Sequence, residues 1–199
     1  MEGLMVEPEK ELESLEAEKE LIRKAKQGNL RSFEGLVKKY QKNIYRLAYR
    51  MTKDHDSADD LAQETFVKAF TSIKSFKEEH SFYPWIFRIC VNLSINYLKR
   101  KKFTVSESEF EPYKLDDKKV VADPMSQLIK DELMEKIESA IDELPPPFKA
   151  VFILKVYEEL SYEQIAKSLN ISVGTVMSRL FRARERLQDS LKDYLQGGG

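Results

Sequence analysis

The sequence has 199 residues, of which 42% are apolar, enough to form one large or two small hydrophobic cores. Its 33 basic and 34 acidic side chains nearly cancel, which excludes a uniformly basic coat for nucleic acid, so any DNA-binding surface has to be local. With only seven Gly and seven Pro, and with Leu, Glu, Lys, Ala and Arg abundant, the composition predicts an all-α protein.

Cysteine and histidine are scarce in this sequence. Cys90 is the only cysteine, so no internal disulfide forms, and His55 and His80 lie far apart. A structural zinc site needs about four ligands at short spacing, so we expect neither metal nor cofactor, and we expect a reducing, cytoplasmic compartment. The acidic start lacks the features of a signal peptide, and no window reaches the ~18 apolar residues of a membrane span, so membrane insertion is not expected.

The N-terminal part begins with an acidic, weakly apolar stretch. We expect residues 1–19 to form a frayed or mobile extension. Leu21, Ile22 and Ala25 then predict a helix that stops at Gly28. Apolar residues at helical spacing from Phe33 to Met51 predict a second, longer helix.

A third helix is predicted to begin after Ser57 and to run to about Ile73, with Asp59 and Asp60 in its first turn. Its apolar residues share one face and its acidic residues the other. Residues 75–82 break the pattern and predict a loop. Pro84 is typical of the first turn of a fourth helix, which the cations at 99–102 close.

Residues 103–123 lack periodicity and predict a linker between a domain at 20–102 and a second at 124–196. The linker is acidic, which suits either mimicry of nucleic acid or an ordinary solvated tether. Asp123 and Pro124 are typical of a helix start, and the three prolines from Pro145 are predicted to end that helix. A further helix is expected from Phe148 to Tyr157.

The most informative pattern lies near the C-terminus. Ser161 and Gln164 fit a capping box that opens a short helix ending at Leu169. Residues 170–172 form a turn in which Asn170 tolerates the left-handed conformation and Ser172 serves as a new N-cap. A long helix follows from Val173 to about Tyr194. This spacing predicts a helix-turn-helix.

The second helix of this motif carries small and basic residues along its early outer face. Small residues let a helix approach base edges, and arginines bind guanine edges or phosphates. The alternative is a solvated basic face on an ordinary helical hairpin. The candidate residues for reading duplex DNA are Ser172, Val173, Gly174, Thr175, Ser178, Arg179, Arg182 and Arg184, with Arg186 beyond them.

Two sets of segments together resemble a known family. DSADDLAQETFVKAF at 56–70 and FYPWIFRICVNLSINYL at 82–98 resemble the second conserved domain of bacterial sigma factors. LSYEQIAKSL at 160–169 and VGTVMSRLFRAR at 173–184 are similar to their fourth domain. Because only a short linker separates them, the match is to the extracytoplasmic-function (ECF) branch of the sigma-70 family, over residues 20–195.

The resemblance implies a transcription initiation factor with two small helical domains, which binds core RNA polymerase at its β′ clamp and β flap. In the family, the acidic face of the third helix binds the β′ clamp. Complementary charge steers such docking and an apolar centre holds it, whereas the bland alternative is a helix showing its solvent side. The corresponding residues are Asp59, Asp60, Gln63, Glu64 and Val67.

The resemblance also assigns promoter contacts. The loop at 75–82 corresponds to the family's pocket for a base flipped from the melted −10 element, and the next helix faces the opened strand. Phenylalanines beside helix ends are as often core anchors, so this alternative stays open. The candidate residues are Phe76, Lys77, His80, Phe82, Trp85, Arg88, Asn92, Asn96 and Lys99, and the helix-turn-helix residues are assigned to the −35 duplex.

Two other function classes remain to be weighed. A two-domain regulator with a ligand-sensing or dimerising N-terminal domain needs neither an acidic polymerase face nor a base-capturing loop. An anti-sigma adaptor has little use for the arginines beyond Ser178. Motifs for catalysis are missing, so we expect no enzyme. The family further implies an anti-sigma antagonist as partner, and we expect no obligate homo-oligomer.

Overall fold

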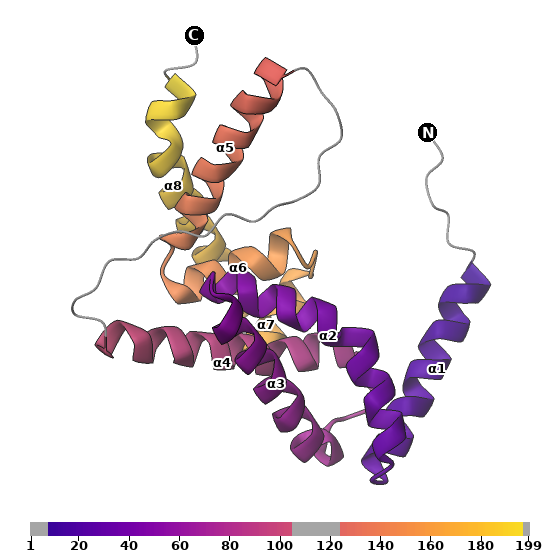
Figure 1. Cartoon of the computed structure of the whole chain (residues 1–199). Coiled ribbons are helices and arrows are strands. Elements are labelled where there is room, and N and C mark those ends of the chain that lie inside the picture. Colours follow the sequence, from indigo (N-terminus) through magenta and orange to yellow (C-terminus); the bar gives the residue numbers. More distant parts are fainter. Residues whose placement is uncertain (1–7, 105–123, 197–199) are drawn as a thin grey trace. The chain divides into compact units, whose positions relative to one another are not determined.

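The computed structural model describes residues 8–104 and 124–196 (Figure 1). The first seven residues, most of the expected linker, the expected cap at Asp123 and the three terminal glycines lie outside the described residues. Every regular element in the two described stretches is helical, which confirms the all-α prediction. The chain divides into two compact units, Met1–Ser94 and Ile95–Gly199.

The first unit is built from helices that follow one another closely along the chain. Its core contains apolar side chains from each of the four α-helices, among them Ile22, Leu36, Leu61 and Ile86. The elements are α1 (Pro8–Lys26), α2 (Leu30–Thr52), α3 (His55–Ser72), the short 3-10 helix η1 (Ile73–Ser75) and α4 (Phe82–Thr104), whose last turns extend past Ser94.

Local capping sets the bounds of α2 and α3. The Asn29 side chain accepts a hydrogen bond from the Ser32 amide at 3.0 Å, and Asp54 accepts one from the Ser57 amide at 2.7 Å. Because Asp54 is the cap, α3 starts at His55, earlier than the sequence predicted. Asp59 and Asp60 therefore lie in its second turn, not its first.

Helix α1 is longer than the sequence predicted. It begins at Pro8, so much of the stretch expected to be frayed is helical. Glu18, in that stretch, is buried, and its carboxylate accepts a hydrogen bond from the Tyr40 hydroxyl at 2.6 Å. The polar side chain thus serves as an anchor on α2, which an apolar-periodicity criterion does not detect.

The second unit contains α5 (Pro124–Asp142), α6 (Pro146–Val156), α7 (Tyr162–Leu169) and α8 (Val173–Gln196). Helix α8 packs against the other three, and Figure 1 shows α5 running beside it. The prolines begin α6 instead of merely ending α5, because Pro146 and Pro147 occupy its first turn, where their missing amide hydrogens cost nothing. Buried Lys149 reaches back to Asp142 at 2.8 Å and joins α6 to α5.

Candidate functional site

The outer face of α3 is acidic and exposed. Its inner face is fixed by buried residues, among them Ala58, Leu61 and Ala69, so the intervening side chains must point outward. In the midst of the charges, Val67 is 63% exposed and adds apolar surface to this face. The exposed polar residues of this face are Asp59, Asp60, Gln63 and Glu64.

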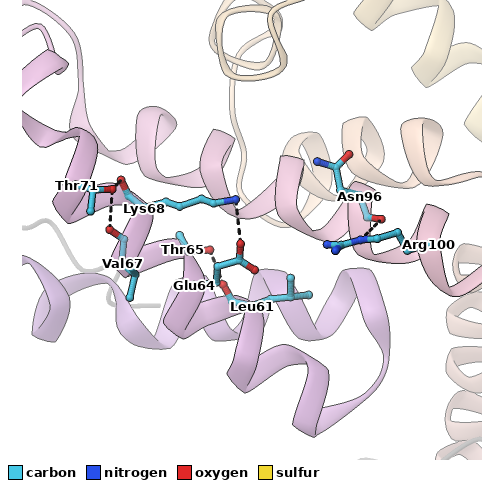
Figure 2. Close-up of polar contacts among 8 residues, drawn as sticks. All are labelled: Leu61, Glu64, Thr65, Val67, Lys68, Thr71, Asn96 and Arg100. Carbon is cyan, nitrogen blue, oxygen red and sulfur yellow. Dashed lines mark hydrogen bonds and ion pairs between the residues drawn. The ribbon is translucent and has the colours of Figure 1, made fainter.

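Contacts within α3 leave this acidic face available. Figure 2 shows Glu64 and Lys68 pointing toward one another along the helix, with 2.9 Å between the carboxylate and the ammonium. Both side chains are about half exposed, so the pair contributes little, on the order of 0.3–0.5 kcal/mol. The Thr65 hydroxyl is turned inward and donates to the Leu61 carbonyl at 2.6 Å. A partner that binds Glu64 therefore loses little free energy by breaking its ion pair with Lys68.

An open hollow between α2 and α3 borders the acidic face. Asp59 and Gln63 contribute to both, so the exposed charges line one edge of a concave surface. Burial and then the negative charge of Asp59 raise the pKa of Tyr45 above its ordinary value. The hollow is lined by Val37, Gln41, Lys42 and Tyr45 from α2 and by Asp59, Ala62, Gln63 and Phe66 from α3.

The loop between η1 and α4 is supported by an aromatic cluster. The ring centroid of Phe76 lies 5.5 Å from that of Phe82 and 5.1 Å from that of Trp85, while Phe82 and Trp85 are 5.2 Å apart. Phe76 is 3% exposed and Phe82 is 1% exposed, so both are core anchors here, the alternative that the sequence left open. Half-buried Trp85 is the ring of this cluster that reaches the surface.

The exposed tip of this loop is polar. The amide of His80 donates to the Lys77 carbonyl at 3.0 Å, which closes a turn whose side chains, Lys77 and His80 included, are exposed. Along α4, the predicted polar residues Arg88, Asn92, Asn96 and Lys99 are also exposed, at helical spacing. The backbone carbonyl of Asn96 accepts a hydrogen bond from the Arg100 side chain at 3.5 Å (Figure 2). The side chain of Asn96 is exposed.

The predicted helix-turn-helix is present as α7 and α8. The Ser161 hydroxyl accepts from the Gln164 amide at 3.2 Å, and the Ser161 amide donates to the Gln164 side chain at 2.7 Å, so the capping box is confirmed. Asn170 adopts the left-handed conformation, with φ of 53°, as expected. The Ser172 hydroxyl then accepts from the Thr175 amide at 3.1 Å and caps α8.

Most of the predicted face of α8 is exposed. Buried Val176, Leu180 and Ala183 hold the inner side of the helix against its neighbours. Val173, Thr175 and Arg179 are half-buried. Beyond them, the guanidinium of Arg186 lies 5.9 Å from the centroid of the Phe148 ring, which ties this arginine to α6. The residues of the face that are fully exposed are Ser172, Gly174, Ser178, Arg182 and Arg184.

Two further residues of this face were missed by the sequence interpretation. Met177 is 54% exposed and Phe181 is 63% exposed, and they lie one turn apart on the same side as Ser178 and Arg182. Their spacing was a usable signal, because Met177 and Phe181 follow the predicted reading residue Val173 at intervals of four residues and therefore lie on the same side of the helix. Residue type alone does not mark them as contact residues, because apolar side chains more often fill a core.

Known protein families match both the part of the chain that contains α3 and α4 and the part that contains α7 and α8. The family model Sigma-70 region 2 matches residues 36–104, and Sigma-70, region 4 matches residues 134–187. The RNA polymerase sigma-H factor of Pseudomonas aeruginosa is 33% identical over 190 residues, which are 91% of this chain and 97% of that protein. The ECF RNA polymerase sigma factor SigW of Bacillus subtilis is 35% identical over 189 residues, 88% of this chain and 97% of SigW.

The chain belongs to the ECF sigma factors. It is therefore a transcription initiation factor, whose partners are core RNA polymerase and promoter DNA. The acidic face of α3 and the loop before α4 fall within the region 2 match, and the exposed face of α8 falls within the region 4 match.

Solved structures share the fold of this sigma factor. The sigma factor RpoE of Bartonella quintana, solved with the anti-sigma factor NepR, superposes with a TM-score of 0.64 at 23% identity, over 82% of this chain and 98% of that one. CnrH, solved with the cytosolic domain of CnrY, gives a TM-score of 0.62 at 24% identity, over 88% and 97%.

Within 8–104 and 124–196, three or more potential metal-ligating side chains do not gather at any one place. In the same stretches, none of the helices combines the length and apolar character needed to cross a bilayer.

Proposed function

We propose that this sigma factor holds core polymerase with the acidic face of α3, captures the melted −10 strand with the loop at 76–81 and the exposed face of α4, and reads the −35 duplex with α8. The observation that carries the proposal is the contrast between two exposed helix faces, one acidic and one rich in arginine, each backed by a buried apolar stripe.

Polymerase binding is supported by the composition of the α3 face. Its acidic residues flank the exposed Val67, an arrangement in which charge steers the approach and an apolar contact slows dissociation. The hollow beside Asp59 enlarges the surface that a helical partner can cover. We therefore expect a basic helical element of the polymerase clamp to dock there.

Capture of the −10 strand is supported by the polar loop tip and by Trp85. Since Phe76 and Phe82 are buried, we assign them to the floor of the pocket and not to direct stacking. Trp85 has exposed surface, and an aromatic ring next to amide and cationic side chains suits an unpaired base. Arg88, Asn92 and Asn96 extend this contact along the strand.

Reading of the −35 duplex is supported by the outer face of α8. Small Gly174 and Ser178 let the backbone approach the major groove, and Arg182 is placed to bind a guanine edge or a phosphate. The exposed Met177 and Phe181 add apolar surface of the kind that contacts thymine methyl groups. Both are therefore added to the proposed reading residues.

The domain assignment and further partners follow from this function. We assign residues 20–102 to polymerase and −10 contacts and 124–196 to the −35 contact. The RpoE and CnrH structures are complexes with NepR and with the cytosolic domain of CnrY, which supports an anti-sigma antagonist for this chain too. Because a sigma factor acts on RNA polymerase, we assign this protein to the cytoplasm, as a subunit without chemistry of its own.

Reconstitution tests the proposal directly. The chain is mixed with sigma-free core polymerase on a library of promoter fragments, and transcripts are sequenced. We expect specific initiation that depends on both upstream elements. A regulator with a helix-turn-helix gives transcripts only when another sigma factor is added, and that outcome overturns the proposal.

A further inference from the structure

The end of α1 reaches the loop that precedes α4. Lys26, in the last turn of α1, donates a hydrogen bond from Nζ to the Phe76 carbonyl at 3.0 Å and pairs with the Glu78 carboxylate at 2.8 Å. Its side chain is only 25% exposed, although Glu78 is about half exposed. One lysine thus holds the backbone and a side chain of a segment fifty residues away in sequence.

Helix α1 is a firm support for this lysine. Ile22 and Ala25 are buried against α2, and a Cβ added to Gly35 would lie 3.2 Å from the Leu21 side chain, so the two helices approach closely there. One turn before Ile22, the Glu18 carboxylate pairs with Lys39 and accepts from the Tyr40 hydroxyl. Burial, and then this carboxylate, raise the pKa of Tyr40 above its ordinary range.

The lysine holds the loop at its first residue, Phe76, and at Glu78 in the turn that follows, while the side chains of that turn remain exposed. The Phe76 carbonyl belongs to the residue whose ring packs against both Phe82 and Trp85, so a contact at this carbonyl also fixes the aromatic floor. The turn at 77–80 is itself closed by a backbone hydrogen bond. A loop held at Phe76 and Glu78 keeps this turn in place before any ligand arrives.

We propose that Lys26 is a positioning residue that presets the 76–81 loop for the captured −10 base. This inference rests on the proposed −10 function of the loop. An ordered loop pays its conformational entropy on folding, so the correct base gains more from binding than it does when the loop must be ordered at that moment. Removing the contacts of Lys26 to the loop should therefore lower the preference for the correct base more than it lowers binding to polymerase or to duplex DNA.

The test uses the full chain reconstituted with core polymerase and a promoter set in which each −10 position carries each of the four bases. Lys26→Met is compared with Lys26→Arg, which keeps the charge and the donors, and with Lys24→Met. Lys24 is the matched control because it sits in the same turn of α1 but pairs with exposed Glu20 at 3.2 Å. The readout is the ratio of transcription between the best and the other bases at the captured position.

We expect Lys26→Met to lower that ratio about three- to tenfold, the effect of roughly one ordinary hydrogen bond. Affinity for core polymerase and for an isolated −35 duplex should stay at the wild-type level, as should all readouts of Lys24→Met. Lys26→Arg should recover most of the ratio. Glu78→Gln, which removes the charge partner and spares the carbonyl contact, should shift the ratio in the same direction by a smaller factor.

The possible failures are distinguishable. A wild-type ratio in Lys26→Met, with wild-type melting of the protein, overturns the role of Lys26 and leaves the proposed function intact. An equal loss of −35 binding and of the ratio means that the lysine only supports folding, and this too overturns the inference. If the wild-type chain itself initiates without preference at any −10 position, the proposed −10 function fails, and the role of Lys26 with it.

Discussion

Helices α3 and α8 present two exposed faces of opposite charge on similar apolar supports. On α3 the outward residues are carboxylates around Val67, while on α8 they are small residues and arginines around Met177 and Phe181. Both faces combine charge with exposed apolar surface, and both helices are held from behind by buried side chains. The chemical difference between the faces is therefore almost purely one of charge and side-chain size.

This difference explains how a chain with almost no net charge can bind both a protein, core RNA polymerase, and promoter DNA. The formal net charge of −1 gives no hint of either surface, because the 33 basic and 34 acidic side chains nearly cancel over the whole sequence. Locally, carboxylates repel DNA phosphates and attract a basic protein element, while arginines do the reverse. In the proposed function, the sign of each face thus selects the class of partner, and the exposed apolar groups hold the partner after docking.

Reversing the charge of the α3 face should have the largest effect. Asp60→Lys with Glu64→Lys is expected to weaken binding to core polymerase by about a hundredfold or more, because like charges then oppose the clamp. The measurement is a binding titration with fluorescently labelled core enzyme. Glu16→Lys with Glu34→Lys, an equal charge change at two exposed positions of α1 and α2, should bind normally. Retained binding by the α3 variant, with normal helicity, refutes this interface.

Truncating an arginine of the α8 face should have the next largest effect. Arg182→Ala is expected to cost about 1–3 kcal/mol at its preferred −35 sequence, or about 5- to 150-fold in Kd, because a bidentate base contact is lost. Gel-shift titrations at fixed salt measure this loss. Lys192→Ala, with the same change of charge on the far end of α8, serves as control. Equal losses in the two variants would mean that only net charge matters on α8.

The exposed apolar residues of α8 test whether its face does more than supply positive charge. Phe181→Ala should weaken the preferred −35 sequence by about 1 kcal/mol and leave non-specific DNA binding unchanged, because an apolar ring discriminates thymine methyls and not phosphates. Since the ring is 63% exposed, stability should change by less than about 0.5 kcal/mol in thermal melts. Met134→Ala, which truncates an exposed residue of α5, should alter neither quantity. Unchanged sequence preference would remove Phe181 from the reading face.

The smallest effect is expected from a substitution at the start of α7, the helix that packs against α8. Ser161→Ala removes the capping box of α7 and should destabilise the protein by about 1 kcal/mol, because the Gln164 amide loses its acceptor. Chemical denaturation followed by circular dichroism measures this change. Ser139→Ala, at an exposed position within α5, should cost nothing, since alanine favours helix. A Ser161→Ala protein as stable as the wild type would show that the box adds nothing to the support of α8.

Much of the fold was predictable because its signals are local. Helical periodicity identified α2, α3 and α8, and the capping box, the left-handed Asn170 and the Ser172 cap were each expected from their residue types. The outward direction of the acidic and arginine faces followed from the same periodicity. Starts and ends of helices were less secure, since Asp54, Asp56 and Ser57 are all plausible caps, and the structure uses Asp54.

The sequence by itself determined which helices form and which way their charged faces point, because these properties depend on residues within about four positions of one another. Only the tertiary structure decided that Phe76 and Phe82 are buried and that Lys26 holds their loop. It also decided that Glu18 anchors α1 and that Met177 and Phe181 stay exposed. Such facts depend on which helices meet, and contacts between residues distant along the chain leave no periodic trace in it.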